Sequence, residues 1–574
     1  MDKRIMAKYN EWLNSDVIKK EDKKELKSIA NDEKEITERF YKDMDFGTGG
    51  LRGIRGVGTN RMNEYVIGKA TQGLANYMLK NEGAKEKGIV IAYDSRIMSP
   101  EFALQAALVM AGNGIKAYLF ESLRATPELS FAVRELGALS GIVVTASHNP
   151  PEYNGYKVYW DDGAQVVAPH DKLIIEEVNK IENLLEIKLA DEETAKKSGL
   201  LNIIGKDLDD KFIDAVKKLV IKQENIDKVA DTFKMVYTPL HGTGNRPVQR
   251  ILKEVGFKNV EVVKEQEQPD GNFPTVGYPN PESPAVYELG IKLAEKTGAK
   301  LVLANDPDAD RIGTAVKTKD GEWIYPNGNQ MGILLSEYIL KNKKDIPKNA
   351  VIISTIVSTP MLDEVVKANN VNIIRTLTGF KFIGEQIKRF EEGKEDYTYL
   401  FGFEESYGYL AGTHARDKDA VVATMLIAEM AASFEAKGSS IAEEIDKMYD
   451  KYGYFREDIE AVTMEGKEGA EKIAKLMTNL RENAPTELLG KKVKMFRDYL
   501  KGIEKDLVNG TEIKLTLPES NVLQFVLEDN TYITARPSGT EPKVKFYFGI
   551  KADSKEAADE KIKLTKAEFV KTIK

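Results

Sequence analysis

The stretch Gly88-Ile89-Val90-Ile91-Ala92-Tyr93, followed by Asp94-Ser95-Arg96 and then by Ser99-Pro100, decides the fold class of this chain. An apolar, β-branched run of this length is typical of a buried strand. Ser99 as N-cap, with Pro100 in the first helical turn, predicts a helix directly after the loop. The next apolar run, Ile115 to Phe120, predicts a second strand. The segment is therefore expected to be one strand–helix–strand unit with parallel strands.

The same pattern occurs twice more, at Phe233 to Val263 and at Val351 to Ile374. Strands that alternate with helices at this spacing predict largely parallel sheets covered by helices. One large α/β sheet is the alternative, but a length of 574 residues favours separate domains. We therefore expect three related α/β domains with mixed, largely parallel sheets.

The two ends of the chain differ from this pattern. Residues 1 to about 45 are rich in Lys and Glu with helical spacing, which predicts a solvated helical arm. Apolar runs from Thr511 to Ile550, separated by polar turns, predict antiparallel strands, and a helix is expected from Ser554 onward. The C-terminal domain is thus expected to be α+β, and the domain boundaries are predicted at 1–205, 206–323, 324–450 and 451–574.

Composition excludes several classes of protein. The content of 42% hydrophobic and 30% charged residues is that of a globular chain, and the absence of Cys excludes disulfides. A net charge of -8 without a basic block argues against a nucleic-acid partner. The N-terminus lacks the pattern of a signal peptide, and the apolar stretch Ala420 to Phe434 is too short to span a membrane. A cytoplasmic protein without a membrane partner is expected.

Thr145-Ala146-Ser147-His148-Asn149-Pro150 offers a hydroxyl nucleophile. It follows the apolar run Gly141 to Val144, and α/β proteins place ligands at the carboxyl ends of such strands. An ordinary polar turn is the alternative. A Ser-His-Asp triad is not expected, because adjacent side chains rarely face each other and no G-x-S-x-G elbow surrounds Ser147.

Asp306-Pro307-Asp308-Ala309-Asp310-Arg311 offers three carboxylates just after the apolar run Leu301 to Ala304. An EF-hand is excluded, because its sixth position holds Arg311 and its twelfth holds Lys317. A solvated acidic turn without a ligand is the alternative, but three aspartates beside a buried strand would repel one another without a cation. One Mg²⁺ per chain is expected here, with a phosphoryl oxygen on Ser147 as a further ligand.

Three further segments carry polar groups. The segment Arg536 to Lys543 can donate hydrogen bonds to a phosphate through the Arg536 guanidinium, its hydroxyls and the backbone N–H groups beside Gly539. A tight turn is the better interpretation if the segment is taken alone. Gly402 to Gly408 places two acids and a hydroxyl after a strand, which suits sugar hydroxyls, although a capped loop is an equally good interpretation if the segment is taken alone. Gly47 to Gly53 is glycine-rich but matches neither a dinucleotide fingerprint nor a Walker A loop.

These motifs, in this order, resemble those of the α-D-phosphohexomutases, and specifically the glucose-1,6-bisphosphate-dependent phosphoglucomutase branch. The resemblance covers essentially the whole chain, and the motifs that carry it are TASHNP, DPDADR, FEESYG and RPSGTEPK. The resemblance implies four domains in a heart-shaped arrangement around a central cleft. It also implies that glucose 1-phosphate and glucose 6-phosphate are interconverted through a phosphoserine and a bisphosphate intermediate. Glucose 1,6-bisphosphate would serve as activator, and small sugar phosphates would be the partners.

The resemblance assigns roles residue by residue. Ser147 is the expected phosphoserine and, with Asp306, Asp308 and Asp310, a ligand of Mg²⁺. The residues expected to assist proton transfer are His148, Lys157, Arg52 and Lys381. Arg96 and Arg311 are expected to steady the phosphoserine. The residues expected to bind the substrate are Thr378, Gly379, Glu404, Ser406, Arg536, Ser538, Gly539 and Thr540.

Alternatives remain at this stage. Some family members that accept mannose carry a His shortly after the sugar-binding Glu and Ser, whereas here Tyr407-Gly408-Tyr409 follow, which favours glucose. A phosphopentomutase or phosphomannomutase on the same scaffold is the first alternative. A sugar-phosphate phosphatase and a non-catalytic sensor are the others, and an intact Ser147 with all three aspartates argues against the sensor.

Overall fold

The computed structural model describes the whole chain except residues 1, 48, 465, 489, 539–542 and 574. The chain forms two compact units, each built from several segments. The first comprises Met1–Pro326, Ile383–Asp396 and Ser406–Gly438, and the second comprises Asn327–Phe382, Tyr397–Glu405 and Ser439–Lys574. We describe each unit by itself.

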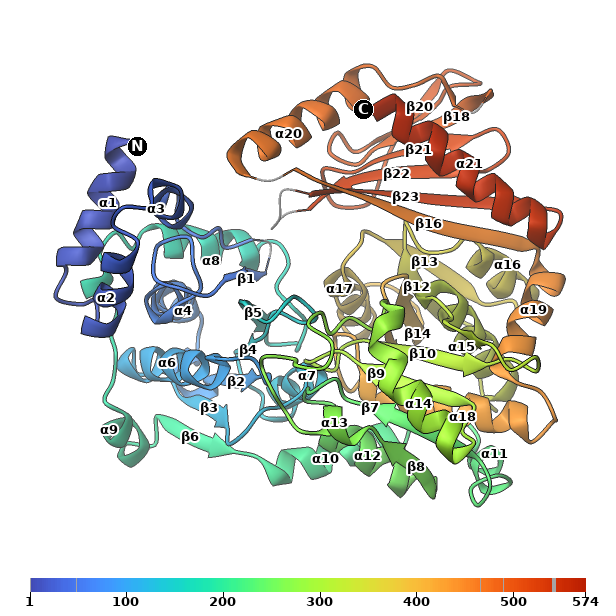
Figure 1. Cartoon of the computed structure of the whole chain (residues 1–574), viewed down its shortest axis with the longest axis horizontal. Helices are drawn as coiled ribbons and strands as arrows, with labels where there is room; N and C mark the ends of the chain where they lie inside the picture. The colour runs from blue at the N-terminus through green and yellow to red at the C-terminus, as the bar shows by residue number, and fades with distance from the viewer. Residues whose placement is uncertain (1, 48, 465, 489, 539–542, 574) are drawn as a thin grey trace. The chain divides into compact units, whose positions relative to one another are not determined.

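The first unit begins with the expected helical arm, α1 (Lys3–Asn14), α2 (Lys20–Ser28) and α3 (Glu33–Phe40) (Figure 1). The buried side chains of the three helices form one core that includes Trp12. A mixed six-stranded sheet follows, in the order β1-β5-β4-β2-β3-β6. Its strands are β1 (Gly50–Ile54), β2 (Ile89–Tyr93), β3 (Ala117–Phe120), β4 (Ser140–Val144), β5 (Tyr153–Trp160) and β6 (Leu201–Ile204). Strands β4, β2, β3 and β6 run parallel, as expected, whereas β5 is antiparallel to both of its neighbours, β4 and β1.

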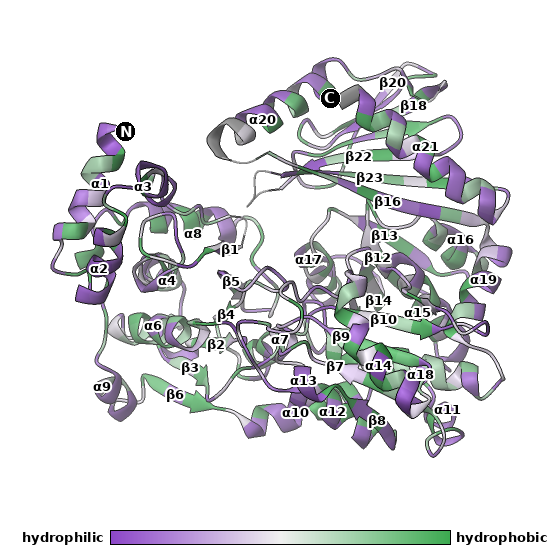
Figure 2. Cartoon of the chain, viewed as in Figure 1, coloured by the Kyte–Doolittle hydropathy of each residue, from purple (hydrophilic) through white to green (hydrophobic). Residues whose placement is uncertain are grey.

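Both faces of this sheet are buried, because alternate side chains of β2 enter different cores. Ile89 and Ile91 join the core formed with α4 (Glu64–Met78) and α6 (Ser99–Gly112). Val90 and Ala92 join the core formed with α7 (Thr126–Glu135). A strand covered on both faces is apolar at every position, which explains the unbroken run in the sequence (Figure 2).

The second sheet of this unit has the order β11-β10-β9-β7-β8. Its strands are β7 (Lys234–Thr238), β8 (Asn259–Val262), β9 (Leu301–Asn305), β10 (Ile312–Lys317) and β11 (Trp323–Ile324). Strands β9, β7 and β8 are parallel, and β10 is antiparallel to both of its neighbours, β9 and β11. Short β15 (Gly408–Ala411) and the buried helix α18 (Ala420–Glu435) complete the unit. Its other helices are α5 (Ala84–Lys87), α8 (His170–Asn179), α9 (Glu192–Lys197), α10 (Lys206–Lys217), α11 (Gln223–Asp227), α12 (Asn245–Glu254), α13 (Lys264–Glu267) and α14 (Glu288–Thr297).

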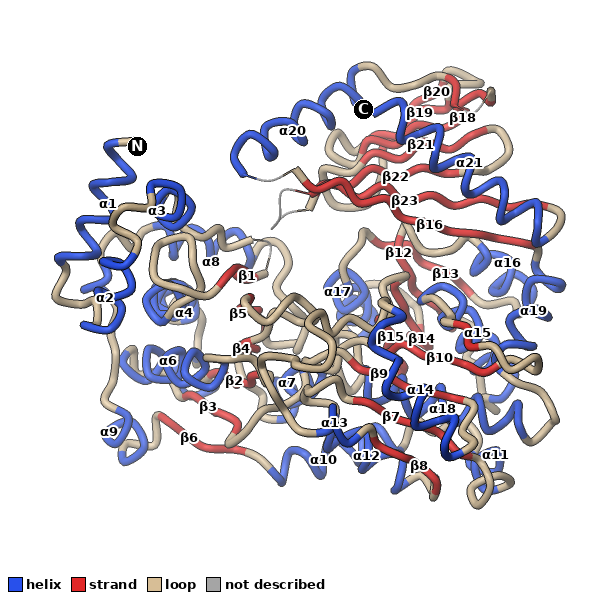
Figure 3. Tube along the Cα trace, in the orientation of Figure 1, coloured by secondary structure: helices blue, strands red, loops and turns tan. Residues whose placement is uncertain are grey.

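The second unit contains the third strand–helix–strand copy and the C-terminal α+β fold (Figure 3). Strands β13 (Asn372–Thr376), β12 (Ala350–Thr355) and β14 (Thr398–Glu404) are parallel neighbours. An antiparallel sheet follows with the order β16-β23-β22-β21-β18-β19-β20. Its strands are β16 (Tyr454–Thr463), β17 (Glu487–Leu488), β18 (Lys491–Asp498), β19 (Ile503–Asp506), β20 (Thr511–Lys514), β21 (Leu523–Leu527), β22 (Tyr532–Pro537) and β23 (Lys543–Ala552). The helices are α15 (Gly328–Asn342), α16 (Met361–Ala368), α19 (Ile441–Tyr452), α20 (Gly466–Glu482) and α21 (Lys555–Ile573), while α17 (Phe380–Glu391) is divided between the units.

Two local expectations change. The N-cap of α6 is Met98, in the left-handed region at φ 69°, and Ser99 is the first helical residue. The Ser99 hydroxyl instead donates to Asp94 at 2.8 Å, so it ties the helix start to the loop after β2. The glycine-rich run contains edge strand β1, where a Cβ on Gly50 would lie 1.9 Å from the Tyr156 carbonyl oxygen. Glycine here serves close strand pairing.

Candidate active site

Ser147 sits in the loop after β4 in a conformation that its neighbours enforce. Its φ of 52° lies in the left-handed region, which is uncommon for a residue other than glycine. Its backbone N–H donates to the Thr145 hydroxyl at 2.8 Å, and its side chain is buried. Strained backbone of this kind is frequent at functional sites.

Arg96, fully buried in the loop after β2, holds this conformation in place. Its guanidinium donates to the carbonyl oxygens of Ser147 at 2.6 Å and of Tyr153 at 3.1 Å, and also to that of Asn149. Asp94 lies 3.3 Å from the Arg96 Nε. Burial lowers the pKa of Arg96, and the Asp94 carboxylate acts against this shift. The loop is therefore held by a buried ion pair.

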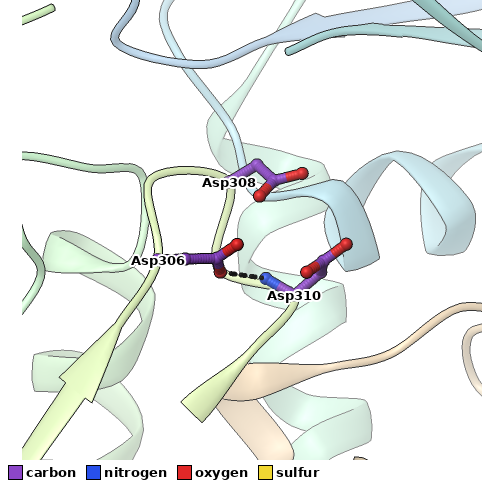
Figure 4. A group of neighbouring side chains, drawn as sticks. All are labelled: Asp306, Asp308 and Asp310. Carbon is purple, nitrogen blue, oxygen red and sulfur yellow. Dashed lines mark hydrogen bonds between the residues drawn. The ribbon is translucent and has the colours of Figure 1, made fainter. Parts of the chain in front are cut away.

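The three aspartates of the loop between β9 and β10 form one cluster (Figure 4). One ligand atom from each lies within 4.8 Å of the others, and all three residues are buried. The backbone N–H of Asp310 donates to Asp306 at 3.2 Å, which curls the loop. The alternating spacing therefore brings the carboxylates together, as expected.

The cluster carries more negative charge than its surroundings stabilise. Burial, with the neighbouring Asp308 and Asp310, raises the pKa of Asp306 well above its usual range. Burial acts to raise the pKa of Asp308, but the Lys157 ammonium at 2.9 Å and the hydrogen bonds with Asp306 and Thr126 together outweigh burial and lower that pKa. A cation bound between the carboxylates would relieve this conflict.

The donor set fits a hard divalent cation. The Oδ1 atoms of Asp308 and Asp310 are buried and have no hydrogen-bond partner among the described residues. All donors are carboxylate oxygens, which Mg²⁺ and Ca²⁺ prefer and which Zn²⁺ rarely uses alone. Asp306, Asp308 and Asp310 are therefore the residues that could hold a metal ion.

Ser147 lies directly against this cluster, as the sequence led us to expect. Its hydroxyl donates to Asp306 Oδ2 at 2.7 Å, across 159 residues of sequence. It also lies 3.2 Å from His148 Nδ1. The expectation that these adjacent side chains would not face each other was wrong, because the left-handed φ of Ser147 turns its side chain toward its neighbour.

Two further residues touch the cluster and were missed from the sequence. The Thr126 hydroxyl, at the start of α7, donates to Asp308 Oδ2 at 2.9 Å. Lys418 Nζ lies 3.3 Å from Asp310 and 2.9 Å from Asp417. The sequence does show a helix start at Thr126-Pro127 and a charged run before α18. Neither pattern indicates that these residues contact the aspartates.

The remaining predicted residues of the first unit lie in different settings. Arg52, on β1, donates to Asn149 at 3.5 Å, so it reaches the Ser147 loop. Lys157, on β5, contacts Asp308 at 2.9 Å and Asp310 at 3.4 Å. Arg311 pairs with Glu282 at 3.2 Å. Ser406 is half-buried at the turn before β15.

In the second unit, two predicted substrate-binding segments come together. Glu404, at the end of β14, accepts a hydrogen bond from the Gly379 N–H at 2.7 Å. The neighbouring Thr378 hydroxyl is buried without a partner among the described residues. Lys381 Nζ lies over the ring of Phe382 at 5.2 Å.

The predicted phosphate grip is described only in part. Arg536 lies 3.5 Å from the Tyr547 hydroxyl and acts to lower the pKa of Glu405, which burial and Glu404 raise. The Ser538 N–H donates to the Lys543 carbonyl at 2.7 Å. Gly539 and Thr540 lie outside the described residues.

Comparison with known proteins agrees with this arrangement. Four domain families of phosphoglucomutase/phosphomannomutase match in order: alpha/beta/alpha domain I at residues 43–185, domain II at 210–321, domain III at 327–452 and the C-terminal domain at 462–567. The chain belongs to the phosphoglucomutase/phosphomannomutase family. The expected fold class, three α/β domains and an α+β domain, is thereby confirmed.

Individual relatives extend along nearly the whole chain. A phosphoglucomutase of Staphylococcus saprophyticus is 37% identical over 522 residues, which are 91% of this chain and 93% of the relative. One from Staphylococcus epidermidis is 36% identical over 96% of this chain and 98% of its own. The structure resembles that of the Paramecium phosphoprotein parafusin, a phosphoglucomutase (TM-score 0.66, 18% identity, 92% of this chain and 95% of that one). It also resembles a family member from Burkholderia thailandensis (TM-score 0.64, 19% identity, 92% and 97%).

Proposed function

We propose that the protein is a phosphoglucomutase that interconverts glucose 1-phosphate and glucose 6-phosphate through a phosphoserine at Ser147 and glucose 1,6-bisphosphate. The observation that carries this proposal is the Ser147 hydroxyl, which lies 2.7 Å from Asp306 within a buried cluster of three carboxylates. A hydroxyl nucleophile beside a site for a hard cation suits phosphoryl transfer. The names of the staphylococcal relatives support glucose as the sugar.

In the transfer step, an oxygen of a sugar hydroxyl attacks the phosphorus of phosphoserine. The new O–P bond forms as the P–Oγ bond to Ser147 breaks, the sugar hydroxyl gives up its proton and Oγ takes one up. His148, with Nδ1 at 3.2 Å from Oγ, is placed to exchange the serine proton. In the second step the bisphosphate returns its other phosphoryl group to Ser147.

We propose Mg²⁺ as the metal, one per chain, held by Asp306, Asp308, Asp310 and an oxygen of the phosphoserine. When bound, it neutralises charge on the transferring group. Lys157 supplies further positive charge: burial acts to lower its pKa, but Asp308 and Asp310 outweigh it and raise that pKa. Lys157 stays assigned to assist proton transfer, and its contacts with Asp308 and Asp310 bring positive charge to the cluster.

The other assignments stay predictions. Arg96 and Arg311 are assigned to steady the phosphoserine, Arg96 through its carbonyl contacts, and Arg52 is assigned to assist proton transfer. The substrate-binding residues are Thr378, Gly379, Glu404, Ser406, Arg536, Ser538, Gly539 and Thr540, and Lys381 is assigned to assist proton transfer. Among the described residues, no helix is long and apolar enough to cross a bilayer; we propose the cytoplasm as the compartment.

The test is a coupled assay for glucose 6-phosphate formed from glucose 1-phosphate, with Mg²⁺ and trace glucose 1,6-bisphosphate. We expect activity in the wild type, its loss in Ser147→Ala, and its retention in Ser140→Ala, which removes one buried neutral hydrogen bond to the Tyr159 carbonyl. Mannose 1-phosphate and ribose 1-phosphate, assayed in parallel, decide the sugar. Full activity of Ser147→Ala, or release of inorganic phosphate at the rate of turnover, would refute the proposal.

A further inference from the structure

The C-terminal sheet of the second unit ends in a strand that has a neighbour on one side only. Strand β20 is the last in the sheet order and pairs with β19 alone (Figure 3). All four of its residues are exposed. Native proteins shield such edges with bulges, prolines, charges or a covering element. Among the described residues, β20 has only the charges of Glu512 and Lys514, because its register with β19 contains no bulge and its sequence no proline.

The hydrogen bonds between β19 and β20 show which backbone groups of β20 point outward. The Leu515 N–H donates to the Gly502 carbonyl at 2.8 Å, so these two residues continue the register as a hydrogen-bonded pair. Hydrogen-bonded and non-hydrogen-bonded pairs alternate along an antiparallel ladder. Ile513 therefore bonds inward to β19, whereas the N–H and C=O groups of Glu512 and Lys514 point away from the sheet.

These outward groups allow two copies of β20 to pair antiparallel, and the charges select the register. In one register, Glu512 of each copy lies opposite Lys514 of the other. A shift by two residues in one direction places Glu512 opposite Glu512, and a shift in the other direction places Lys514 opposite Lys514. Opposite charges on facing residues stabilise a strand pair, and like charges destabilise it. One register is therefore favoured and both of its neighbours are disfavoured.

The same register brings apolar side chains together on the other face of the strands. Ile513, which is 57% exposed, lies opposite Ile513 of the second copy, and Thr511 lies opposite Leu515. Since the Ile513 pair is not hydrogen-bonded, its side chains approach closely, and their contact removes apolar surface from water. The acid beside Ile513 on this face, Glu504, is already paired with Arg497.

The charged side chains of β20 are available for the contact. Lys514 is exposed and has no ion-pair partner in the part of the chain that the structure describes. Glu512 lies 3.3 Å from Lys505 on β19, and both of these side chains are about half exposed. In the selected register, each Glu512 carboxylate lies between Lys505 of its own chain and Lys514 of the second copy. Charges of opposite sign therefore alternate across the joined strands.

We propose that β20 is a self-association surface through which two copies of this chain pair antiparallel, with Ile513 on the two-fold axis. The two C-terminal sheets then form one continuous sheet. A contact that uses the same patch on both copies closes at a dimer. Because one short strand from each copy forms the contact, the dimer belongs to the weak class of interfaces, with a Kd on the order of 10–100 µM.

A single introduced cysteine tests the register, because the chain has no Cys. Ile513→Cys places two Cα atoms about 4.5 Å apart across the axis, a distance that a disulfide spans. Val508→Cys is the control. Val508 is more exposed, at 70%, but the turns that hold it lie on opposite sides of the axis, more than about 13 Å apart. We expect oxidation to link Ile513→Cys into dimers and to leave Val508→Cys monomeric. Equal linking of the two variants would refute the register.

Sedimentation equilibrium of the full chain, from about 5 to 500 µM, tests the association and its charges. We expect a monomer–dimer equilibrium in the wild type. Glu512→Lys places like charges opposite each other twice per dimer, so it should raise the Kd about tenfold or more, and addition of Lys514→Glu should recover most of this loss. Glu528→Lys, the same charge change at an exposed position after β21, should leave the Kd unchanged.

Three results would overturn the proposal. The first is a wild type that stays monomeric up to 500 µM, which would mean that the charges protect the edge or leave it to a strand of another protein. The second is a dimer that Glu512→Lys weakens no more than Glu528→Lys does, which would place the interface elsewhere. The third is a double variant that associates no better than Glu512→Lys, because exchange of the two charges restores their attraction only if they face each other.

Discussion

Replacement of Thr126 by Val tests the idea that α7 positions the aspartate cluster. The substitution keeps the shape of the side chain and removes its hydroxyl, which donates to Asp308 Oδ2 at 2.9 Å in a fully buried setting. A hydrogen bond to a charged group contributes about 1.5–3 kcal/mol. Asp308 keeps its contact with Lys157 at 2.9 Å, so we expect a loss near the lower value.

The loss should appear in the Mg²⁺ requirement as well as in stability. About 1.4 kcal/mol corresponds to a factor of ten in an equilibrium constant, so we expect the Mg²⁺ concentration for half-maximal mutase rate to rise about tenfold. The assay is glucose 6-phosphate formation over a range of Mg²⁺ concentrations, combined with urea unfolding of each variant.

The matched control is Thr71→Val, in α4. Thr71 is equally buried, but its hydroxyl binds the Ile67 carbonyl at 2.7 Å and the Tyr156 hydroxyl, which are neutral groups. We expect it to lose about 1 kcal/mol of stability with an unchanged Mg²⁺ requirement. Equal half-saturating Mg²⁺ concentrations in the two variants would show that Thr126 does not position Asp308.

Three more perturbations follow from buried groups. Arg96→Met leaves Asp94 without its ion-pair partner and should cost about 3 kcal/mol in urea unfolding, and the double variant with Asp94→Asn should recover part of this; no recovery would contradict the pairing. Since the pKa of Glu128 rises from an ordinary 4.5 to about 8 on folding, its contribution is present below pH 4.5 and is lost as the pH rises to 8. Glu128→Gln should therefore remove a decline of up to roughly 1.4 kcal/mol per pH unit in this window, and parallel pH profiles of the two proteins would exclude the shift. Gly155→Ala places a Cβ 2.4 Å from the Thr145 carbonyl oxygen, so it should lower the melting temperature by several degrees, and an unchanged value would show that the strands can separate there.

The sequence predicted helices and strands well where the hydrophobic periodicity agrees with the capping and turn residues at the ends of the segment. The run of residues 88–93 contains β2 (Ile89–Tyr93), and alternate side chains of this strand enter two cores because helices cover both faces. The errors were local. Ser99 is the first helical residue of α6 rather than its N-cap, because Met98 is the N-cap and adopts the left-handed conformation. Strand β1, which begins at Gly50, was missed because its sequence contains no apolar run.

Residue type and short spacing are enough to predict the chemical groups of this protein: a hydroxyl at Ser147, three alternating carboxylates from Asp306 to Asp310, and the strand ends that both segments follow. These are properties of residue type and short spacing, which local sequence encodes. Which side chains contact these groups depends on the tertiary fold. Thr126 and Asp308 are 182 residues apart, and Lys418 reaches Asp310 from the segment before α18. Such contacts depend on how α7 and α18 pack against the two sheets of the first unit, and packing is a property of the whole core rather than of any motif.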